Sequence, residues 1–287
     1  MDADRIFIGP HGLRAGWRFA LFAVVVLLLL AAQTALVQYR LLTILPAYAI
    51  DMLREALALA CVLVGMWVMS RVENRPVSAF GLSPADRGRN FAAGIGSGFL
   101  TISALVGGLV AIRSYSFGAP GLHGVDILAW GAFLAVDFLL VGLFEELFMR
   151  GYPLYSVGQG IGFWPAAVIF AVLFGLGHIG NRGEEIMGVV NAMLAGLVFA
   201  YTLRWSGSLW WAIGCHASWD WGESFFYGVA DSGGTSSHHW LTGHPHGAAW
   251  LSGGSVGPEG SLLAIPAILL WAVLVRATAK ERKATPA

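Results

Sequence analysis

Few ionisable residues lie inside the apolar segments of this chain, and two of them are adjacent. Glu145 and Glu146 close an apolar segment in the stretch FEELFMR. A charged side chain at the centre of a bilayer costs about 2.5–3.5 kcal/mol even on lenient insertion scales, so such residues need a partner or a function. Other such residues, which we single out as candidates, are Asp137, His178, His216, Asp220 and Glu223.

Helical spacing places several of these residues on common faces. His216, Asp220 and Glu223 follow one another at intervals of four and three residues, so all three share one face of a helix. Asp137 and Glu145 are eight residues apart and also share a face. We therefore expect two helices to present acid and imidazole groups toward a common interior.

The adjacent glutamates must have different roles. Successive helical residues lie about 100° apart, so Glu145 and Glu146 cannot both point into one cavity. Arg150 follows Glu146 by four residues, the favourable order for a helical ion pair. We interpret Glu146 and Arg150 as a structural, supporting pair at the membrane interface, and Glu145 as the free carboxylate.

A free carboxylate with two histidines and a second acid can hold and deprotonate a water molecule. Here these residues are Glu145, His178, His216 and Asp220, which we take as the candidate catalytic set. The alternative is that each polar residue only hydrogen-bonds a neighbouring helix, as often happens in membrane bundles. Four such residues together favour the catalytic interpretation.

The composition indicates an integral membrane protein. Of 287 residues, 57% are hydrophobic and 12% are charged, against about 25% charged in a soluble domain. The formal net charge is zero, which gives no argument for a nucleic-acid partner. Cys61 and Cys215 lie in apolar segments and imply no disulfide framework.

Apolar runs of about 20 residues predict an all-α, polytopic bundle of about eight transmembrane helices in a single domain spanning residues 1–287. The predicted spans are 17–38, 48–70, 91–112, 126–149, 163–180, 186–204, 208–228 and 261–277. The basic residues Arg40, Arg54, Arg113 and Arg182 then fall on one side, and the other thirteen, which include Arg5 and Lys283, fall on the opposite side. The positive-inside rule places both termini in the cytoplasm.

Residues 229–260 are rich in Gly, Ser and His and are predicted to form a flexible external loop. Four histidines gather there, in HHWLTGHPH. A solvated polar loop and a metal-binding loop are both compatible with this composition, and the first is the simpler interpretation.

Three motifs resemble those of a known family. EELFMR matches an EExxxR motif, FGLGH an FxxxH motif, and HASWD an HxxxN or HxxxD motif. In this order, over about residues 126–225, they are similar to the CAAX-prenyl endopeptidase and bacteriocin-processing (CPBP/Abi) family of intramembrane proteases. The resemblance implies peptide-bond hydrolysis in a membrane cavity by water that a glutamate activates.

Carried over by motif position, Glu145 is the general base and His178 helps to hold the water. His216 and Asp220 then polarise the scissile carbonyl and stabilise the oxyanion. Eukaryotic CAAX proteases carry Asn at the position of Asp220, and an ionised carboxylate would repel an oxyanion. We therefore expect Asp220 to orient His216 instead.

The cofactor prediction is none, with zinc as the alternative. Two histidines and a carboxylate with an open fourth position describe a catalytic zinc site, for which His178 and His216 would be the ligands. No HExxH motif is present, so we favour catalysis without a metal.

One geometric difficulty concerns depth in the membrane. Glu145 lies near the cytoplasmic end of the fourth span and His178 near the outer end of the fifth. The two residues meet only if the fourth helix continues past Arg150 toward Ser156, despite Pro153, or if the fifth begins well inside the bilayer.

Two other functions stay open: a proton-coupled transporter or channel that uses Asp137, Glu145 and the histidines as a relay, and a scaffold without catalysis. For a protease, the expected partners are the lipid bilayer and a membrane-associated peptide or protein, either a prenylated C-terminal peptide or a double-glycine-type leader. The expected location is a bacterial cytoplasmic membrane.

Overall fold

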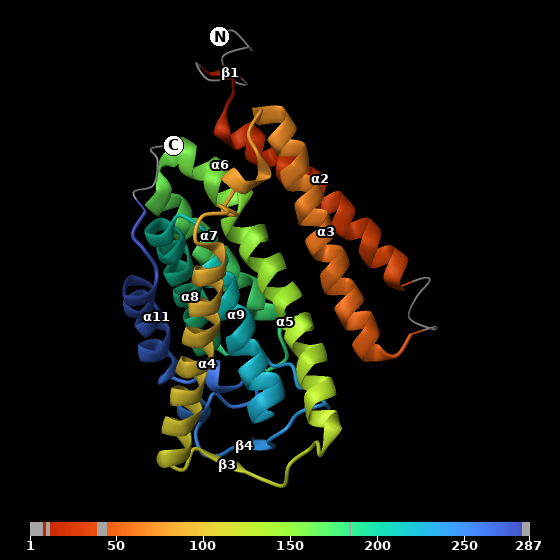
Figure 1. Ribbon diagram of the computed structural model, residues 1–287, viewed down its shortest axis with the longest axis vertical. Helices are drawn as coiled ribbons and strands as arrows, with labels where there is room; N and C mark the ends of the chain where they lie inside the picture. The colour runs from red at the N-terminus through yellow and green to blue at the C-terminus, as the bar shows by residue number, and fades with distance from the viewer. Residues whose placement is uncertain (1–7, 10–11, 39–44, 184, 283–287) are drawn as a thin grey trace.

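Long apolar helices make up most of the chain (Figure 1). The computed structural model describes residues 8–9, 12–38, 45–183 and 185–282. The helices are α2 (Ala15–Leu36), α3 (Ala47–Glu73), α4 (Arg87–Ala111), α5 (Val125–Arg150), α6 (Tyr152–Ile161), α7 (Phe163–Gly177), α8 (Ile186–Ser206), α9 (Trp210–Trp221), α10 (Ala249–Ser252) and α11 (Ala264–Thr278).

Shorter elements join these helices. The strands are β1 (Ile8–Gly9), β2 (Gly12–Leu13), β3 (Tyr115–Phe117) and β4 (Gly243–Pro245), paired antiparallel as β1–β2 and β3–β4. The short helical turns are η2 (Val77–Ala79), η3 (His178–Gly180), η5 (Pro258–Gly260) and the π-helix η4 (Gly222–Tyr227), which continues α9.

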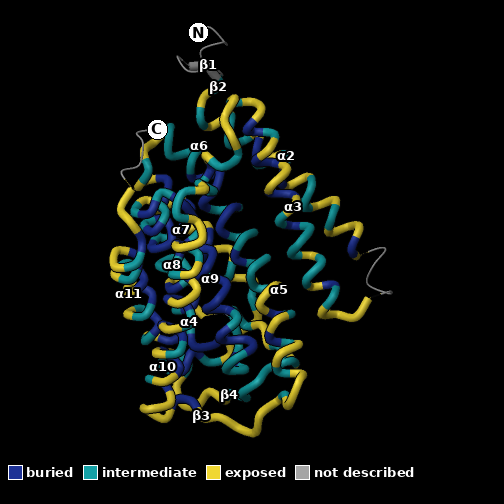
Figure 2. Tube along the Cα trace, in the orientation of Figure 1, coloured by how far each residue is buried: buried dark blue, intermediate teal, exposed yellow. Residues whose placement is uncertain are grey.

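Each of the eight predicted spans coincides with a helix, and the polytopic helical bundle is confirmed. Within the described residues, six helical segments are long and apolar enough to cross a membrane, and they match the first six predicted spans. The last two spans contain α9 and α11, of 12 and 15 residues. At 1.5 Å per residue, α9 is too short to cross a bilayer of about 30 Å alone. It lies inside the bundle instead, where most of its side chains are buried (Figure 2).

The beginning of α2 and the end of α11 lie at the same end of the bundle (Figure 1). Arg18 in the first turn of α2 pairs with Glu73, the last residue of α3, at 2.6 Å. Arg89 at the start of α4 donates to the carbonyl of Thr278, the last residue of α11, at 2.6 Å. An even number of membrane crossings requires that the first and last helices begin and end at the same end of the bundle, as they do here. Three residues of the predicted charge pattern, Arg5, Arg40 and Lys283, lie outside the described residues.

Glycines allow α4 and α9 to pack with their backbones in contact. A Cβ on Gly94 would overlap the carbonyl oxygen of Trp211, and one on Gly98 would overlap that of Cys215. In turn, Gly214 of α9 faces the carbonyl of Phe91. Lipid provides no hydrophobic driving force for helices to associate, so association depends on van der Waals contact. Small residues at the interface allow that contact because the backbones can approach closely. The close approach fixes the axis of α9, which carries two of the predicted site residues.

The helix α6 explains how Glu145 and His178 can lie at similar depths in the bundle. The chain does not reverse at Arg150 but runs on from Gly151 through α6 to Gly162, where φ is +91° and glycine is favoured. Pro153 fits in the first turn of α6, where no backbone N–H is needed. Glu145 precedes Gly162 by 17 residues and His178 follows it by 16. The two residues therefore return to similar heights, as the first of the two solutions requires.

Residues 229–260, expected to form an external loop without a core, are instead folded against the bundle. The strand β4 of this segment pairs with β3, so the segment is tied to the connection between α4 and α5. Val229 and Val256 are buried, and Gly257, at φ +117°, lies against the carbonyl of Ala230. Composition misled us because a few buried apolar residues and glycine turns are enough to anchor a segment to a surface that already exists.

Because α4 packs closely on α9, the effect of a Gly→Val substitution in α4 on stability should depend strongly on its position. We expect Gly98→Val to lower the free energy of unfolding by about 1–3 kcal/mol more than Gly107→Val, because overpacking against a backbone cannot relax. Gly107 is on the same helix and has open space around it, so it controls for helix propensity. Cys61 and Cys215 are free and buried, so a thiol-reactive dye can report unfolding in detergent. Equal effects at the two glycines would contradict the packing argument.

Candidate active site

The predicted catalytic residues line one cavity of about 390 Å³. Glu145 comes from α5, His178 from η3 at the end of α7, and His216 and Asp220 from α9. Residues far apart in the sequence thus converge, which agrees with the expectation of a shared interior. Asp137 does not line this cavity, although one of its carboxylate oxygens is buried without a hydrogen-bond partner.

The imidazole of His216 uses its two nitrogens on different sides. Nδ1 lies 3.1 Å from Oε1 of Glu146. Nε2 lies 3.6 Å from Oε2 of Glu145 and 3.5 Å from Oδ2 of Asp220. Since an ionised carboxylate only accepts hydrogen bonds, Nδ1 carries the proton that Glu146 binds. That bond fixes the ring so that Nε2 faces the cavity.

The packing of α5 on α9 sets the distance between His216 and the two glutamates. Gly142, one turn before Glu145, lies against the carbonyl of Ile213 and the amide of Ala217. The ring of His216 also stacks on Phe199 of α8, with centroids 5.5 Å apart. Backbone contact on one side and an aromatic face on the other leave the imidazole little freedom.

Glu146 and Arg150 form the predicted ion pair, with Nη1 and Oε1 2.6 Å apart. We expected this pair at the membrane interface; within the protein it is completely buried, with the two side chains 0% and 1% exposed. An ion pair that leaves water must be compensated by further hydrogen bonds. The bond from His216 to the same oxygen of Glu146 is one such compensation.

The space for Arg150 is built from a glycine and two aromatic rings. Its Nε donates to the carbonyl of Gly196 at 3.3 Å, and a Cβ at that glycine would lie 2.7 Å from Nη2. The guanidinium carbon lies 4.3 Å from the ring centroid of Phe174 and 5.6 Å from that of Phe199. The electron-rich ring faces attract the cation. Larger side chains in this place would displace the arginine and its partner.

His178 is held by its own helix. Its Nδ1 lies 2.8 Å from the carbonyl oxygen of Phe174, one turn earlier, and so donates to it. This leaves Nε2 as an acceptor. Among the described residues, the histidine–carboxylate pairs of the site belong to His216 and not to His178. His178 therefore borders the cavity without touching Glu145.

Two acids of the cavity were not found from the sequence. Asp231 and Glu259 line it together with Asp220, and both come from the segment after α9. Glu259 accepts hydrogen bonds from the amide and the hydroxyl of Ser232, at 2.6 and 2.7 Å. No periodicity marks these acids, because an irregular segment has no face; their position depends on how that segment docks.

The alternative zinc site does not fit this geometry. It would need nitrogens of His178 and His216 and a carboxylate oxygen close together around one ion, at about 2.0–2.2 Å from it. Among the described residues, the set of three possible ligands whose atoms all lie within 4.8 Å of one another is Asp220, Glu223 and Asp231. That set contains no histidine.

The comparisons with known proteins agree with the motif resemblance. Residues 127–222 match the family described as type II CAAX prenyl endopeptidase Rce1-like. This confirms the resemblance for about a third of the chain, the third that carries all three motifs. Neither the curated proteins nor the solved structures gave a significant match.

Because the Glu146–Arg150 pair is buried, replacing Arg150 should greatly reduce the stability of the protein. Arg150→Met leaves Glu146 buried without its cation, so the free energy of unfolding should fall by about 3–5 kcal/mol. Arg54 pairs with Asp51 at 3.3 Å in an exposed position, and Arg54→Met should cost at most about 1 kcal/mol. Dye-monitored unfolding in detergent measures both variants. A small loss at Arg150 would show that Glu146 does not depend on it.

Proposed function

We propose that this chain, whose residues 127–222 form the Rce1-like segment of a CAAX-type intramembrane protease, hydrolyses a peptide bond with water activated by Glu145. The observation that supports this most is the division between the adjacent glutamates. Glu145 borders the cavity with a side chain 29% exposed, whereas Glu146 is 0% exposed and holds Arg150 and His216.

Glu145 serves as the general base. Its carboxylate takes a proton from the water as the water oxygen attacks the scissile carbonyl carbon. His178 assists because its free Nε2 can accept a hydrogen bond from that water. When the C–N bond breaks, the proton on Glu145 passes to the leaving nitrogen, which restores the carboxylate.

His216 stabilises the oxyanion. With Glu146 bound to Nδ1, the imidazolium form donates from Nε2 toward the cavity, where the carbonyl oxygen gains charge. The carboxylates of Glu145 and Asp220, both within 3.6 Å of Nε2, favour the cationic ring. Removing one donor of this kind from a hydrolase costs about 10²–10³ in rate.

Asp220 faces the same nitrogen that the oxyanion needs. In the resting site it can accept the Nε2–H and so complete the orientation of His216, whose Nδ1 is already held by Glu146. We therefore propose a more limited role for Asp220 than orienting the ring alone. Glu146 fixes the orientation of the His216 ring, and Asp220 accepts from Nε2 until a substrate carbonyl replaces it.

The walls of the cavity suggest the substrate class. About half of the lining residues are aromatic or aliphatic, and the others are mainly acids, histidines and amides. Such a site suits an extended, membrane-associated peptide whose scissile bond lies beside Glu145 and His216. A proton relay through the same helices is less well supported, because Asp137 does not line the cavity.

The two glutamates predict two different phenotypes. Glu145→Gln should abolish cleavage with little change in unfolding temperature, since the loss of a general base costs about 10²–10⁴ in rate. Glu146→Gln should keep part of the activity and mainly reduce stability, because the amide can still accept from Nδ1 of His216.

The measurement is quantitative proteomics of membrane peptides in cells with wild type or either variant, combined with dye-monitored unfolding of the purified proteins. Peptides that accumulate equally in the two variants, with both proteins folded, would remove the assigned distinction.

The metal-free mechanism predicts resistance to a zinc chelator. Activity should survive 1,10-phenanthroline, and active protein should contain far less than one zinc per chain. Asp220→Asn should keep partial activity, since an amide can accept from Nε2 or donate to the oxyanion. Asp220→Ala should lose more, because an unmet buried hydrogen bond costs about 1–3 kcal/mol. Zinc-dependent recovery after chelation would contradict this mechanism and leave the peptidase assignment intact.

A further inference from the structure

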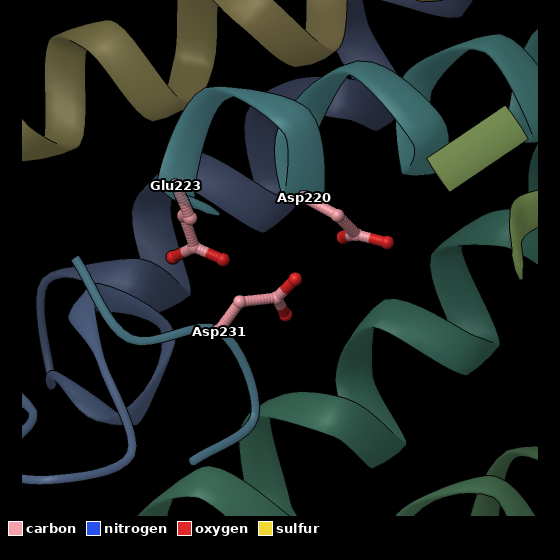
Figure 3. Close-up of side chains that lie close together, drawn as sticks. All are labelled: Asp220, Glu223 and Asp231. Atoms are coloured by element: carbon pink, nitrogen blue, oxygen red, sulfur yellow. The ribbon is translucent and has the colours of Figure 1, made fainter. Parts of the chain in front are cut away.

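Three carboxylates meet beside the cavity, on the side where the segment after α9 closes it (Figure 3). Asp220 comes from α9, Glu223 from the π-helix η4, and Asp231 from the segment that follows. Each offers one oxygen, and these three oxygens all lie within 4.8 Å of one another. In Figure 3 the side chain of Glu223 points toward Asp231, and the carboxylate of Asp231 points toward the space below Asp220.

The carboxylate of Glu223 has no close protein partner; the indole of Trp219 lies near it but outside hydrogen-bond geometry. The side chain of Glu223 is 0% exposed, and both carboxylate oxygens are buried with no hydrogen bond. An ionised carboxylate in such a place carries a penalty of several kcal/mol unless a charge or hydrogen bonds offset it. The side chain is aimed at Asp231 (Figure 3), an acid that does not offset a negative charge.

The surroundings supply too little positive charge. Among the described residues, no lysine or arginine forms an ion pair with Asp220, Glu223 or Asp231, and the nearest basic partner is His216, 3.5 Å from Asp220. Asp231 accepts one bond, from the hydroxyl of Ser224 at 3.3 Å. The cluster is thus rich in oxygen ligands and poor in counter-charge.

We propose that Asp220, Glu223 and Asp231 bind a divalent cation that prefers oxygen ligands, and that this cation is Ca²⁺. Ca²⁺ binds carboxylates and water at about 2.3–2.6 Å, so two oxygens on one ion lie up to about 5 Å apart, and the cluster meets this limit. Carboxylates without histidine or cysteine favour hard cations over zinc. Glu259, on the wall of the same cavity, adds negative charge that favours a cation there.

The local backbone supports a binding role for Glu223. An α-helix would continue its regular spacing after Asp220, but the chain widens into the π-helix η4 at Gly222. Turns of π-helix are rare in proteins overall, and those that occur are often found at functional sites. Gly222 packs against Ile102 of α4, which holds the widened turn in place. A cation here would also tie the segment after α9 to the helix that carries His216.

The experiment uses the full chain in detergent, stripped with EDTA and then titrated with Ca²⁺ or Mg²⁺ while a thiol-reactive dye follows unfolding. Saturating Ca²⁺ should raise the unfolding temperature by roughly 2–5 °C, since a ligand that binds only the folded state stabilises it. Tb³⁺ serves as a direct probe: excitation of Trp219, next to Asp220 in the chain, should sensitise its luminescence, and Ca²⁺ should displace it.

Two variants and a control complete the test. Glu223→Gln and, separately, Asp231→Asn should each weaken Ca²⁺ binding at least about tenfold, while the unfolding temperature without metal stays the same or rises because an unpaired buried charge is gone. Glu281→Gln, an exposed acid outside the cluster, should change neither quantity.

Wild-type protein that shows no Ca²⁺ shift and no Tb³⁺ signal would overturn the proposal and leave the cluster protonated. A Ca²⁺ response that survives in Glu223→Gln and Asp231→Asn would also overturn it. Neither readout measures peptide cleavage, so the result stands apart from the proposed peptidase activity.

Discussion

The buried charge of Arg150 is the constraint around which the site is built. A guanidinium that is 1% exposed must find its counter-charge and its hydrogen bonds inside the protein. Glu146 provides the charge, and the carbonyl of Gly196 provides a hydrogen bond. Because Glu146 also binds Nδ1 of His216, the same pair connects α5, α8 and α9. The geometry of the imidazole follows from how the arginine is buried.

This arrangement explains why two adjacent glutamates occur in an apolar segment, where even one carboxylate carries a free-energy cost. The 100° step of the helix sends one side chain to the buried arginine and the other to the cavity. In the proposed mechanism the first is fixed and acts through His216, as carboxylates that orient metal-ligating histidines do in other proteins. The second stays accessible to water. Neither residue could perform the other's role without turning the helix.

The sequence was sufficient where periodicity and membrane length determine the structure. The eight apolar segments became helices, and Glu145, His178, His216 and Asp220 came to one cavity because isolated polar groups in an apolar bundle need partners. The complete burial of the Glu146–Arg150 pair was not predictable, since spacing gives the pair but not its surroundings. Asp231 escaped notice because only tertiary docking brings an irregular segment to α9. The widening of α9 at Gly222 also depends on packing against α4.

In the proposed mechanism, the charge around the cavity connects the catalytic residues with the acidic cluster. Glu145, Glu146 and Asp220 surround one imidazole, and one arginine compensates only Glu146. Where eukaryotic CAAX proteases carry an amide, Asp220 adds a further negative charge beside the position of the oxyanion. A cation shared with Glu223 and Asp231 would offset part of that charge and would leave the proposed roles of Asp220 and His216 unchanged. The acid in place of the amide and the three-carboxylate cluster would then form one electrostatic unit.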